Sequence, residues 1–265
     1  MDKGEIFREL EKDFTATFIE ELMPGILHNF ANPLNGIMGR SKLSQRRIEE
    51  TIRKMEEKYP DAAAGMAEDL RRIKADISSV NSETEYFFDM FKDVAGKFHA
   101  LVEKNDNRIN ISHLLAAEMR FFDFYLNFKH EIKKDIQWDK DMPEFIGNVA
   151  DLSLGFWRII RFAMTRALAS SLKEFHIKTD HDSKYVNVFI KSSGEAMPAA
   201  DLKNLMENLT SDSLDMNGVV EKGFLLSLLL FDKHQAKINF FSEENFSTIS
   251  IGFPYRSDRI VRKEM

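Results

Sequence analysis

The chain has 265 residues and a formal net charge of −6, with 43% hydrophobic and 30% charged residues, which is typical of a folded protein of one or two domains. It contains no cysteine, so disulfides, thiolate metal sites and cysteine nucleophiles are excluded. The negative net charge gives no support for sequence-independent binding of nucleic acid. The longest apolar run, 224–231, is too short to cross a bilayer, and the charged N-terminus lacks the apolar core of a signal peptide. We therefore expect a cytoplasmic protein without membrane insertion, or the cytoplasmic part of a system whose sensor lies elsewhere.

Two long helical patterns fill the N-terminal part of the chain. Apolar residues recur every three or four positions over about 6–58, and again over about 61–103 after a break at Tyr59-Pro60. The short connection predicts an antiparallel helical hairpin over 1–105. Because such a hairpin cannot bury both of its apolar stripes alone, we expect a homodimer in which two hairpins form a four-helix bundle.

The pattern changes to mixed α/β beyond the polar stretch 104–108. We expect helices over 110–128, 150–171, 199–209 and 223–234, strands over 132–138, 174–178 and 185–191, a loop or short strand over 143–148, and a final hairpin of 237–242 with 246–253. This order predicts a two-layer α/β sandwich over 106–258, followed by a C-terminal tail over 259–265. The expected fold class of the whole chain is therefore α+β.

A histidine and an asparagine stand four residues apart within the first helical pattern. Residues at this spacing lie on one face of a helix, so His28 and Asn32 can address the same bound group. Pro33 follows directly, removes one backbone donor and bends the helix locally, which exposes its neighbours. A lone histidine seldom has a special task. A functional role for His28 therefore needs support from the surrounding sequence.

The order of the two parts resembles that of a histidine-kinase transmitter over about residues 20–254. In that family a dimerisation and histidine-phosphotransfer hairpin precedes a catalytic domain of the histidine-kinase ATPase type. The stretch His28-Asn29-Phe30-Ala31-Asn32-Pro33-Leu34 is similar to the family's H-box. The resemblance implies that His28 is the phosphorylated histidine and that Asn32 orients water for dephosphorylation of a partner response regulator. The family usually has Glu or Asp at the position of Asn29 to help deprotonate the imidazole, and an amide cannot act as that base.

The first nucleotide-binding box of the family is the asparagine-containing N-box. Its two asparagines align with Phe162 and Arg166, within the expected helix 150–171. The amide that would hold magnesium is thus replaced by a cation, which cannot ligate a metal.

The two glycine boxes also depart from the family pattern. The Asp-x-Gly-x-Gly box aligns with 192–196, where Ser192 replaces the adenine-reading aspartate, Gly194 is retained and Ala196 replaces the second glycine. The Gly-x-Gly-Leu-Gly-Leu box aligns with 219–224. It retains Gly223, while Val219 and Glu221 replace the other two glycines where the backbone should approach phosphates.

The resemblance implies a two-component signal transduction protein. Such a protein either exchanges a phosphoryl group between its histidine and the aspartate of a response-regulator receiver domain or dephosphorylates that receiver domain. The departures in the nucleotide boxes indicate that ATP binding is lost. We expect such a pseudokinase to carry no cofactor and no metal. Arg166, Gly194 and Gly223 would bind ATP with Mg²⁺ only if nucleotide binding is retained. Two alternatives stay open. An active but divergent ATP-dependent histidine kinase would show nucleotide affinity, whereas a non-catalytic dimeric scaffold that sequesters a response regulator would tolerate replacement of His28.

Overall fold

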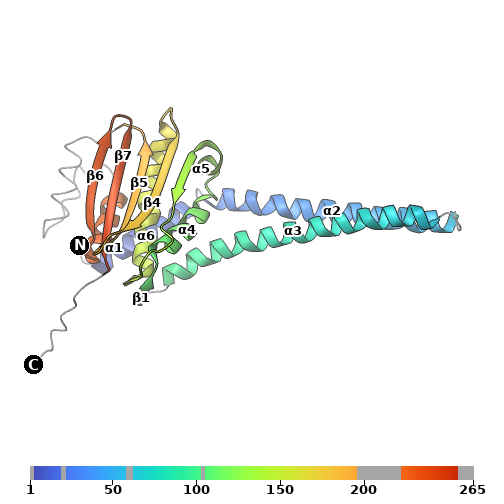
Figure 1. Ribbon diagram of the computed structural model, residues 1–265, viewed down its shortest axis with the longest axis horizontal. Coiled ribbons are helices and arrows are strands. Elements are labelled where there is room, and N and C mark those ends of the chain that lie inside the picture. Colours follow the sequence, from blue (N-terminus) through green and yellow to red (C-terminus); the bar gives the residue numbers. More distant parts are fainter. Residues whose placement is uncertain (1–2, 19–21, 58–61, 103–104, 196–221, 256–265) are drawn as a thin grey trace, which may run out of the picture. The chain divides into compact units, whose positions relative to one another are not determined.

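The computed structural model describes residues 3–18, 22–57, 62–102, 105–195 and 222–255 (Figure 1). These residues fall into two compact units, one within 1–22 and 96–265 and the other within 23–95. The first unit contains a β-sheet with helices and is called the α/β unit below. The second consists of two helices and is called the hairpin unit.

The hairpin unit is formed by α2 (Met23–Glu57) and by α3 (Ala62–Val102) up to residue 95. Phe30 on α2 packs edge-on against Phe87 on α3, with ring centroids 5.2 Å apart. At the other end of the hairpin, Lys54 forms an ion pair with Asp69 at 3.2 Å. From the first contact to the second, the residue number rises on α2 and falls on α3. The two helices therefore run antiparallel, as the sequence predicts.

A buried carboxylate fixes the register of the two helices. Asp76 on α3 is only 5% exposed and forms ion pairs with Arg47 and, at 3.6 Å, with Arg40 of α2. The two arginines stand seven residues apart, which places them on one face of α2. A shift of one helix along the other by a turn would leave this carboxylate buried without its cations, which is costly. The dimeric four-helix bundle stays a prediction.

The α/β unit is built on a mixed five-stranded sheet of order β2-β4-β5-β7-β6. Its strands are β2 (Lys133–Gln137), β4 (Glu174–His181), β5 (Tyr185–Ser193), β6 (Lys237–Glu243) and β7 (Phe246–Pro254). β2 and β4 are parallel, and the other neighbouring pairs are antiparallel. A separate antiparallel pair is formed by β1 (Asp106–Ile109) and β3 (Phe145–Asn148). The α+β class expected from the sequence is thereby confirmed.

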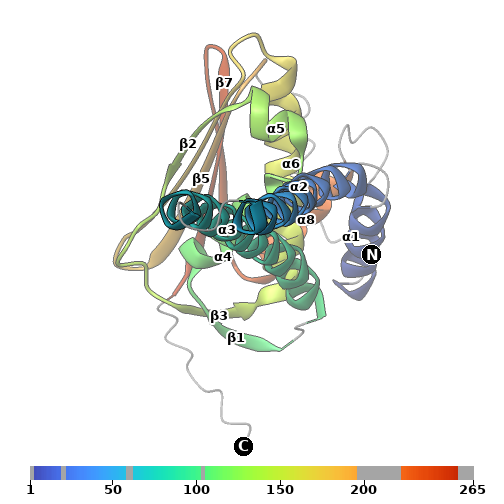
Figure 2. The same cartoon turned by 90° about the vertical axis from the view of Figure 1, so that its right-hand side faces the viewer.

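Helices cover one face of the sheet, as Figure 2 shows from the edge. They are α4 (Ile111–Phe122), α5 (Leu126–Glu131), α6 (Val149–Ala169) and α8 (Lys222–Lys233). Alternate strand residues such as Phe175, Val188 and Ile251 are fully or almost fully buried, as expected for strands with one covered face. Phe231 of α8 packs edge-on against Phe253 of β7 at 5.4 Å. The expected helix over 199–209 lies outside the described residues.

The N-terminal helix differs from the expectation of one helical pattern over 6–58. The structure has α1 (Lys3–Thr17) and α2 as separate helices, and α1 packs on α6 and α8 within the α/β unit. The apolar stripe of α1 is buried there: Phe14 is 1% exposed and lies edge-on to Trp157, 4.9 Å between ring centroids. A helical period indicates which face is buried, but it does not identify the surface against which that face packs.

Two further differences arise near the start of the α/β unit. The sequence predicts no strand in the polar stretch 104–108, yet 106–109 forms β1, whose first three residues are exposed and show no apolar alternation. The single helix expected over 110–128 is two helices, because the chain turns at Asp123–Tyr125. Aromatic side chains at 121, 122, 124, 125 and 128 are all buried, and their spacing fits one face of a continuous helix equally well, so the periodicity does not reveal the turn.

Within the described part of the chain, no helix is both long enough and apolar enough to cross a membrane.

The interior of the α/β unit contains a closed ionic network around Lys97, near the end of α3. The ammonium group contacts Glu118 Oε2 at 2.6 Å, the Ser153 carbonyl at 3.1 Å and Ser153 Oγ at 2.7 Å. Ser153 Oγ in turn donates to Glu118 Oε1 at 2.7 Å. Both charged side chains are at most 4% exposed. Burial lowers the pKa of Lys97, and the neighbouring Glu118 carboxylate opposes that shift.

We predict that Glu118→Leu lowers the free energy of unfolding by about 3–5 kcal/mol, because it leaves the Lys97 ammonium buried without a counter-ion. Adding Lys97→Met removes the second charge and should recover most of that loss. Urea unfolding followed by circular dichroism measures both effects. Lys133→Met, which breaks the exposed pair with Glu174, is the control and should leave stability unchanged. A double variant as unstable as the sum of its single variants would show that the two charges are not coupled.

Candidate functional sites

The first candidate site lies on α2, where His28 and Asn32 are both exposed. Asn32 Nδ2 lies 3.5 Å from His28 Nε2, so the two side chains meet on one helix face as the spacing predicts. Pro33 follows inside the helix and lacks the N–H that would donate to the carbonyl of Asn29. An imidazole nitrogen and an amide are therefore presented together at the surface.

Asn29 takes no part in this pair. Its side-chain amide donates to the carbonyl of Gly25, one turn earlier on the same helix, at 3.0 Å. The side chain is 8% exposed. Adjacent helical residues point about 100° apart, which separates Asn29 from the face of His28 and Asn32.

The second candidate site lies on the α/β unit, around the positions that align with the N-box. Phe162 on α6 stacks on Phe224 of α8, with ring centroids 4.3 Å apart and an interplanar angle of 27°. The Arg166 guanidinium lies 5.5 Å from the centre of the Phe162 ring. Burial lowers the pKa of Arg166, and the charge of Glu195 raises it. An aromatic ring and a cation thus occupy the two positions that the sequence analysis aligns with the N-box asparagines.

Gly194 lies where β5 ends and faces the last turn of α6. Its φ of +133° belongs to a region that L side chains rarely adopt, and a Cβ there would meet the Arg166 carbonyl at 3.2 Å. Its N–H donates to the carbonyl of Asn245 at 2.8 Å. The neighbouring Ser192 is 3% exposed, and Ser193 Oγ accepts a hydrogen bond from the backbone N–H of Glu174 at 2.9 Å. Glycine at 194 is thus required by local backbone geometry.

Gly223 lies in the first turn of α8 and is covered by an arginine. A Cβ built on it would meet Arg158 Nε at 2.2 Å, so the guanidinium lies directly against the glycine. Arg158 Nη1 also forms an ion pair with Asp13 Oδ2 of α1 at 3.2 Å. The absence of a side chain at Gly223 therefore has a packing reason within the α/β unit. The other aligned positions, Ala196, Val219 and Glu221, lie outside the described residues.

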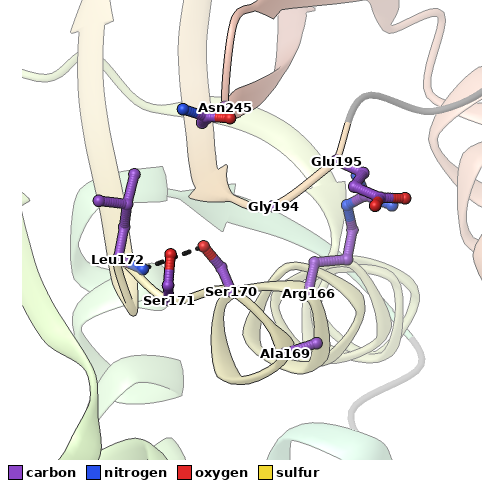
Figure 3. Close-up of a pocket in the computed structure, with 8 residues that line it drawn as sticks. All are labelled: Arg166, Ala169, Ser170, Ser171, Leu172, Gly194, Glu195 and Asn245. Atoms are coloured by element: carbon purple, nitrogen blue, oxygen red, sulfur yellow. Dashed lines mark hydrogen bonds between the residues drawn. The ribbon is translucent and has the colours of Figure 1, made fainter.

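A cavity of about 500 Å³ adjoins Arg166 and Gly194 at the end of α6 (Figure 3). Its other polar walls are Ser170, Ser171, Glu195 and Asn245. The sequence pattern did not select the serines or Asn245, because they come from separate loops and match no motif. Arg158 and Asp13 were missed because they match no motif and lie on two helices far apart in the sequence.

Metal-binding groups do not gather in the described residues: among them, no three His, Asp or Glu side chains are placed to hold one ion.

Comparison with known proteins gives structural neighbours only. No protein-family model matches the chain, and no curated protein matches it. The catalytic domain of histidine kinase ThkA superposes with a TM-score of 0.47 at 16% identity, covering 57% of this chain and 97% of that structure. Histidine kinase AdeS of Acinetobacter baumannii has a TM-score of 0.44 at 10% identity and covers 82% and 96%. The mycobacterial sensor histidine kinase MprB has a TM-score of 0.44 at 11% identity and covers 57% and 98%.

We predict that Gly223→Ala destabilises the α/β unit, because its new Cβ must displace the Arg158 guanidinium. An exposed helical glycine should respond in the opposite direction, since alanine favours a helix by about 0.5–1 kcal/mol. Gly96→Ala on α3 is the matched control, with no heavy atom within 4 Å of its new Cβ. Thermal unfolding measures both variants. Equal stabilisation by both would contradict the packing role of Gly223.

Proposed function

We propose that this chain is a transmitter-type protein of two-component signalling in which His28 exchanges a phosphoryl group with the aspartate of a receiver domain. The domains of this proposal are the hairpin over 1–105 and the ATPase-like sandwich over 106–258. Asn32 orients water for dephosphorylation of the receiver. The proposal treats the protein as a phosphotransferase or phosphatase and not as an autokinase.

The observation that carries the proposal is the exposed pair of His28 and Asn32, 3.5 Å apart on one face of α2. Attack on an aspartyl phosphate requires an accessible imidazole nitrogen with its lone pair directed at phosphorus. Dephosphorylation requires a group that holds water in line with the same bond, and an amide can do so by hydrogen bonding. One helix face supplies both groups, and the receiver supplies magnesium and acid catalysis.

The side chains at the positions aligned with the nucleotide-binding boxes support a loss of ATP binding. The stack of Phe162 on Phe224 presents apolar rings where phosphate and magnesium would need polar partners. Arg166 has no lone pair to give a metal. Arg158 covers Gly223, so the start of α8 does not offer its backbone to a phosphate there. Asn29, with its amide bonded to its own helix, provides no base for His28.

The proposed partners are a second copy of the chain and a receiver domain. Large apolar side chains are half exposed on the hairpin unit: Leu34, Ile77, Tyr86, Phe88 and Phe91. An apolar surface of this kind on two helices is typical of a bundle completed by another pair of helices. A homodimer would bury part of it, and the part near His28 would remain for the receiver.

We predict that calorimetric titration with ATP and Mg²⁺ gives no binding heat. The melting temperature should also stay unchanged, whereas a ligand present at a hundred times its Kd would stabilise the protein by about 2.7 kcal/mol. A labelled-ATP assay run beside it should leave His28 unlabelled. Saturable binding with acid-labile label at His28 would overturn the loss of nucleotide binding and favour the divergent kinase.

We predict that receiver domains from the same genome, phosphorylated with acetyl phosphate, transfer their phosphoryl group to the wild-type protein as an acid-labile adduct. His28→Gln should abolish the adduct, and His130→Gln, an exposed histidine on α5, should preserve it. Asn32→Ala should keep transfer but slow the loss of phosphate from the receiver at least tenfold, with the exposed Asn35→Ala as its control. Gel mobility of phosphorylated species measures both steps. Receiver binding without transfer, unaffected by His28→Gln, would favour the scaffold.

A further inference from the structure

A histidine of the α/β unit has one ring nitrogen held by a carboxylate. His181 is the last residue of β4, and its Nδ1 lies 2.5 Å from Asp139 Oδ2. The hydrogen bond with His181 lowers the pKa of Asp139, so this carboxyl group is ionised and acts as the acceptor. In the neutral imidazole, Nδ1 therefore carries the proton and Nε2 keeps its lone pair. The side chain of His181 is exposed.

Asp139 is held in place by contacts other than the one with His181. Its backbone N–H donates to Thr179 Oγ1 at 2.9 Å, and its Oδ1 accepts the N–H of Asp141 at 3.0 Å. Thr179 is only 2% exposed, and its hydroxyl lies 2.8 Å from Ser112 Oγ. A chain of hydrogen bonds thus runs from the interior to the carboxylate. The orientation of the imidazole is therefore set by groups that are themselves fixed.

This arrangement distinguishes His181 from the other histidines whose side chains the structure describes. Both nitrogens of His176 lie near carboxylates, at 3.4 and 3.7 Å. His234 has a carboxylate partner at 3.2 Å, but its side chain is only 11% exposed. Among the described residues, no carboxylate lies within 4.0 Å of the ring nitrogens of the remaining three, His28, His113 and His130. Within this set, only His181 combines an exposed ring, one nitrogen held by a carboxylate and a second nitrogen without a partner.

An imidazole held in this way is suited to act as a nucleophile. Attack through Nε2 places positive charge on the ring, which a carboxylate at Nδ1 stabilises. Asn29 offers no such group to His28, because its amide donates to a backbone carbonyl. The pair of His181 and Asp139 contains no acid that could protonate a leaving group, so the donor has to release a weakly basic one. The carboxylate released by an acyl phosphate is such a group.

The charges around the pair allow a small anionic donor to approach. Asp182 follows His181, but its Oδ1 accepts the backbone N–H groups of Lys184 and Tyr185 at 2.7 and 2.8 Å, which offset its charge. Lys140 and Lys184 are both exposed and lie close to the pair in the chain. Cations at the surface raise the local concentration of small anions.

We propose that His181 is a second phosphoacceptor, which takes a phosphoryl group at Nε2 from a small acyl phosphate. The lone pair of Nε2 forms the new bond to phosphorus, while the bond between phosphorus and the acyl oxygen breaks. That electron pair leaves with the carboxylate, and the Nδ1 proton stays in its hydrogen bond to Asp139. Asp139 is a positioning residue. The site is separate from His28 and stands whether or not a receiver domain exchanges phosphoryl groups there.

The test uses the full chain with His28→Gln, so that the histidine of the hairpin unit contributes no label. Acetyl phosphate should give this variant one acid-labile phosphoryl group, which mass spectrometry places on His181 and ¹⁵N NMR on Nε2. Adding His181→Gln should abolish the label, and adding His130→Gln, a change at an exposed histidine without a carboxylate partner, should preserve it. A phosphorylated receiver domain freed of acetyl phosphate should leave His181 unlabelled.

Asp139→Asn, added to the same variant, tests the positioning role. It should slow labelling at least tenfold and distribute the phosphoryl group over Nε2 and Nδ1, a change that loss of a merely structural contact would not produce. Thermal unfolding confirms that the variant is folded. Absence of label with acetyl phosphate, equal label on His113 and His130, an unchanged rate and position in Asp139→Asn, or label from the receiver alone would each overturn the proposal. Failure of transfer to His28 in the wild-type chain would count against the proposed function and not against this site.

Discussion

The architecture of the α/β unit depends on the buried contacts of the Lys97 ammonium group. It stands at the end of α3 and bonds to Glu118 of α4 and Ser153 of α6. It also lies 5.4 Å from the centre of the Phe14 ring of α1. A charge buried to this degree is tolerated only where every donor finds a partner. Four helices must therefore keep their mutual positions, which fixes α6, the helix that carries Phe162 and Arg166.

The two candidate sites differ in how their residues are constrained. His28 and Asn32 are exposed, and their side chains are not held in place by packing of the core. Residues of the second site are held by their neighbours: Phe162 by its stack on Phe224, and Gly194 by its backbone angle and the nearby Arg166 carbonyl. Because core packing does not constrain the exposed pair, its function can be tested by replacement without disturbing the fold.

The sequence allowed prediction of most elements but not of their partners. Strong alternation and a clear turn predicted β4, β5 and the final hairpin within a few residues of their observed bounds. β1 could not be predicted, because a strand with three exposed polar residues is held by backbone hydrogen bonds that leave no apolar pattern. The packing of α1 on α6 and α8 was equally hidden, since Phe14 and Trp157 are 143 positions apart in the chain.

The same limit applies to the sites. The four-residue spacing of His28 and Asn32 is local, so sequence alone placed the two groups together. Nε and Nη2 of Arg166 are buried and have no hydrogen-bond partner among the described residues. This state depends on the surroundings of one side chain, which the spacing of residues in the sequence does not encode.

Gly223 shows why a retained motif residue is weak evidence for a retained ligand. In an alignment it looks like the last remnant of a phosphate-binding loop. In the structure its bare Cα gives room to the Arg158 guanidinium, which Asp13 holds from α1. Packing alone can preserve such a glycine after its ligand is lost, because any side chain there would displace a buried cation. Whether a glycine belongs to a binding loop must therefore be decided from what occupies the space beside it. At Gly223 that space is filled by the protein itself.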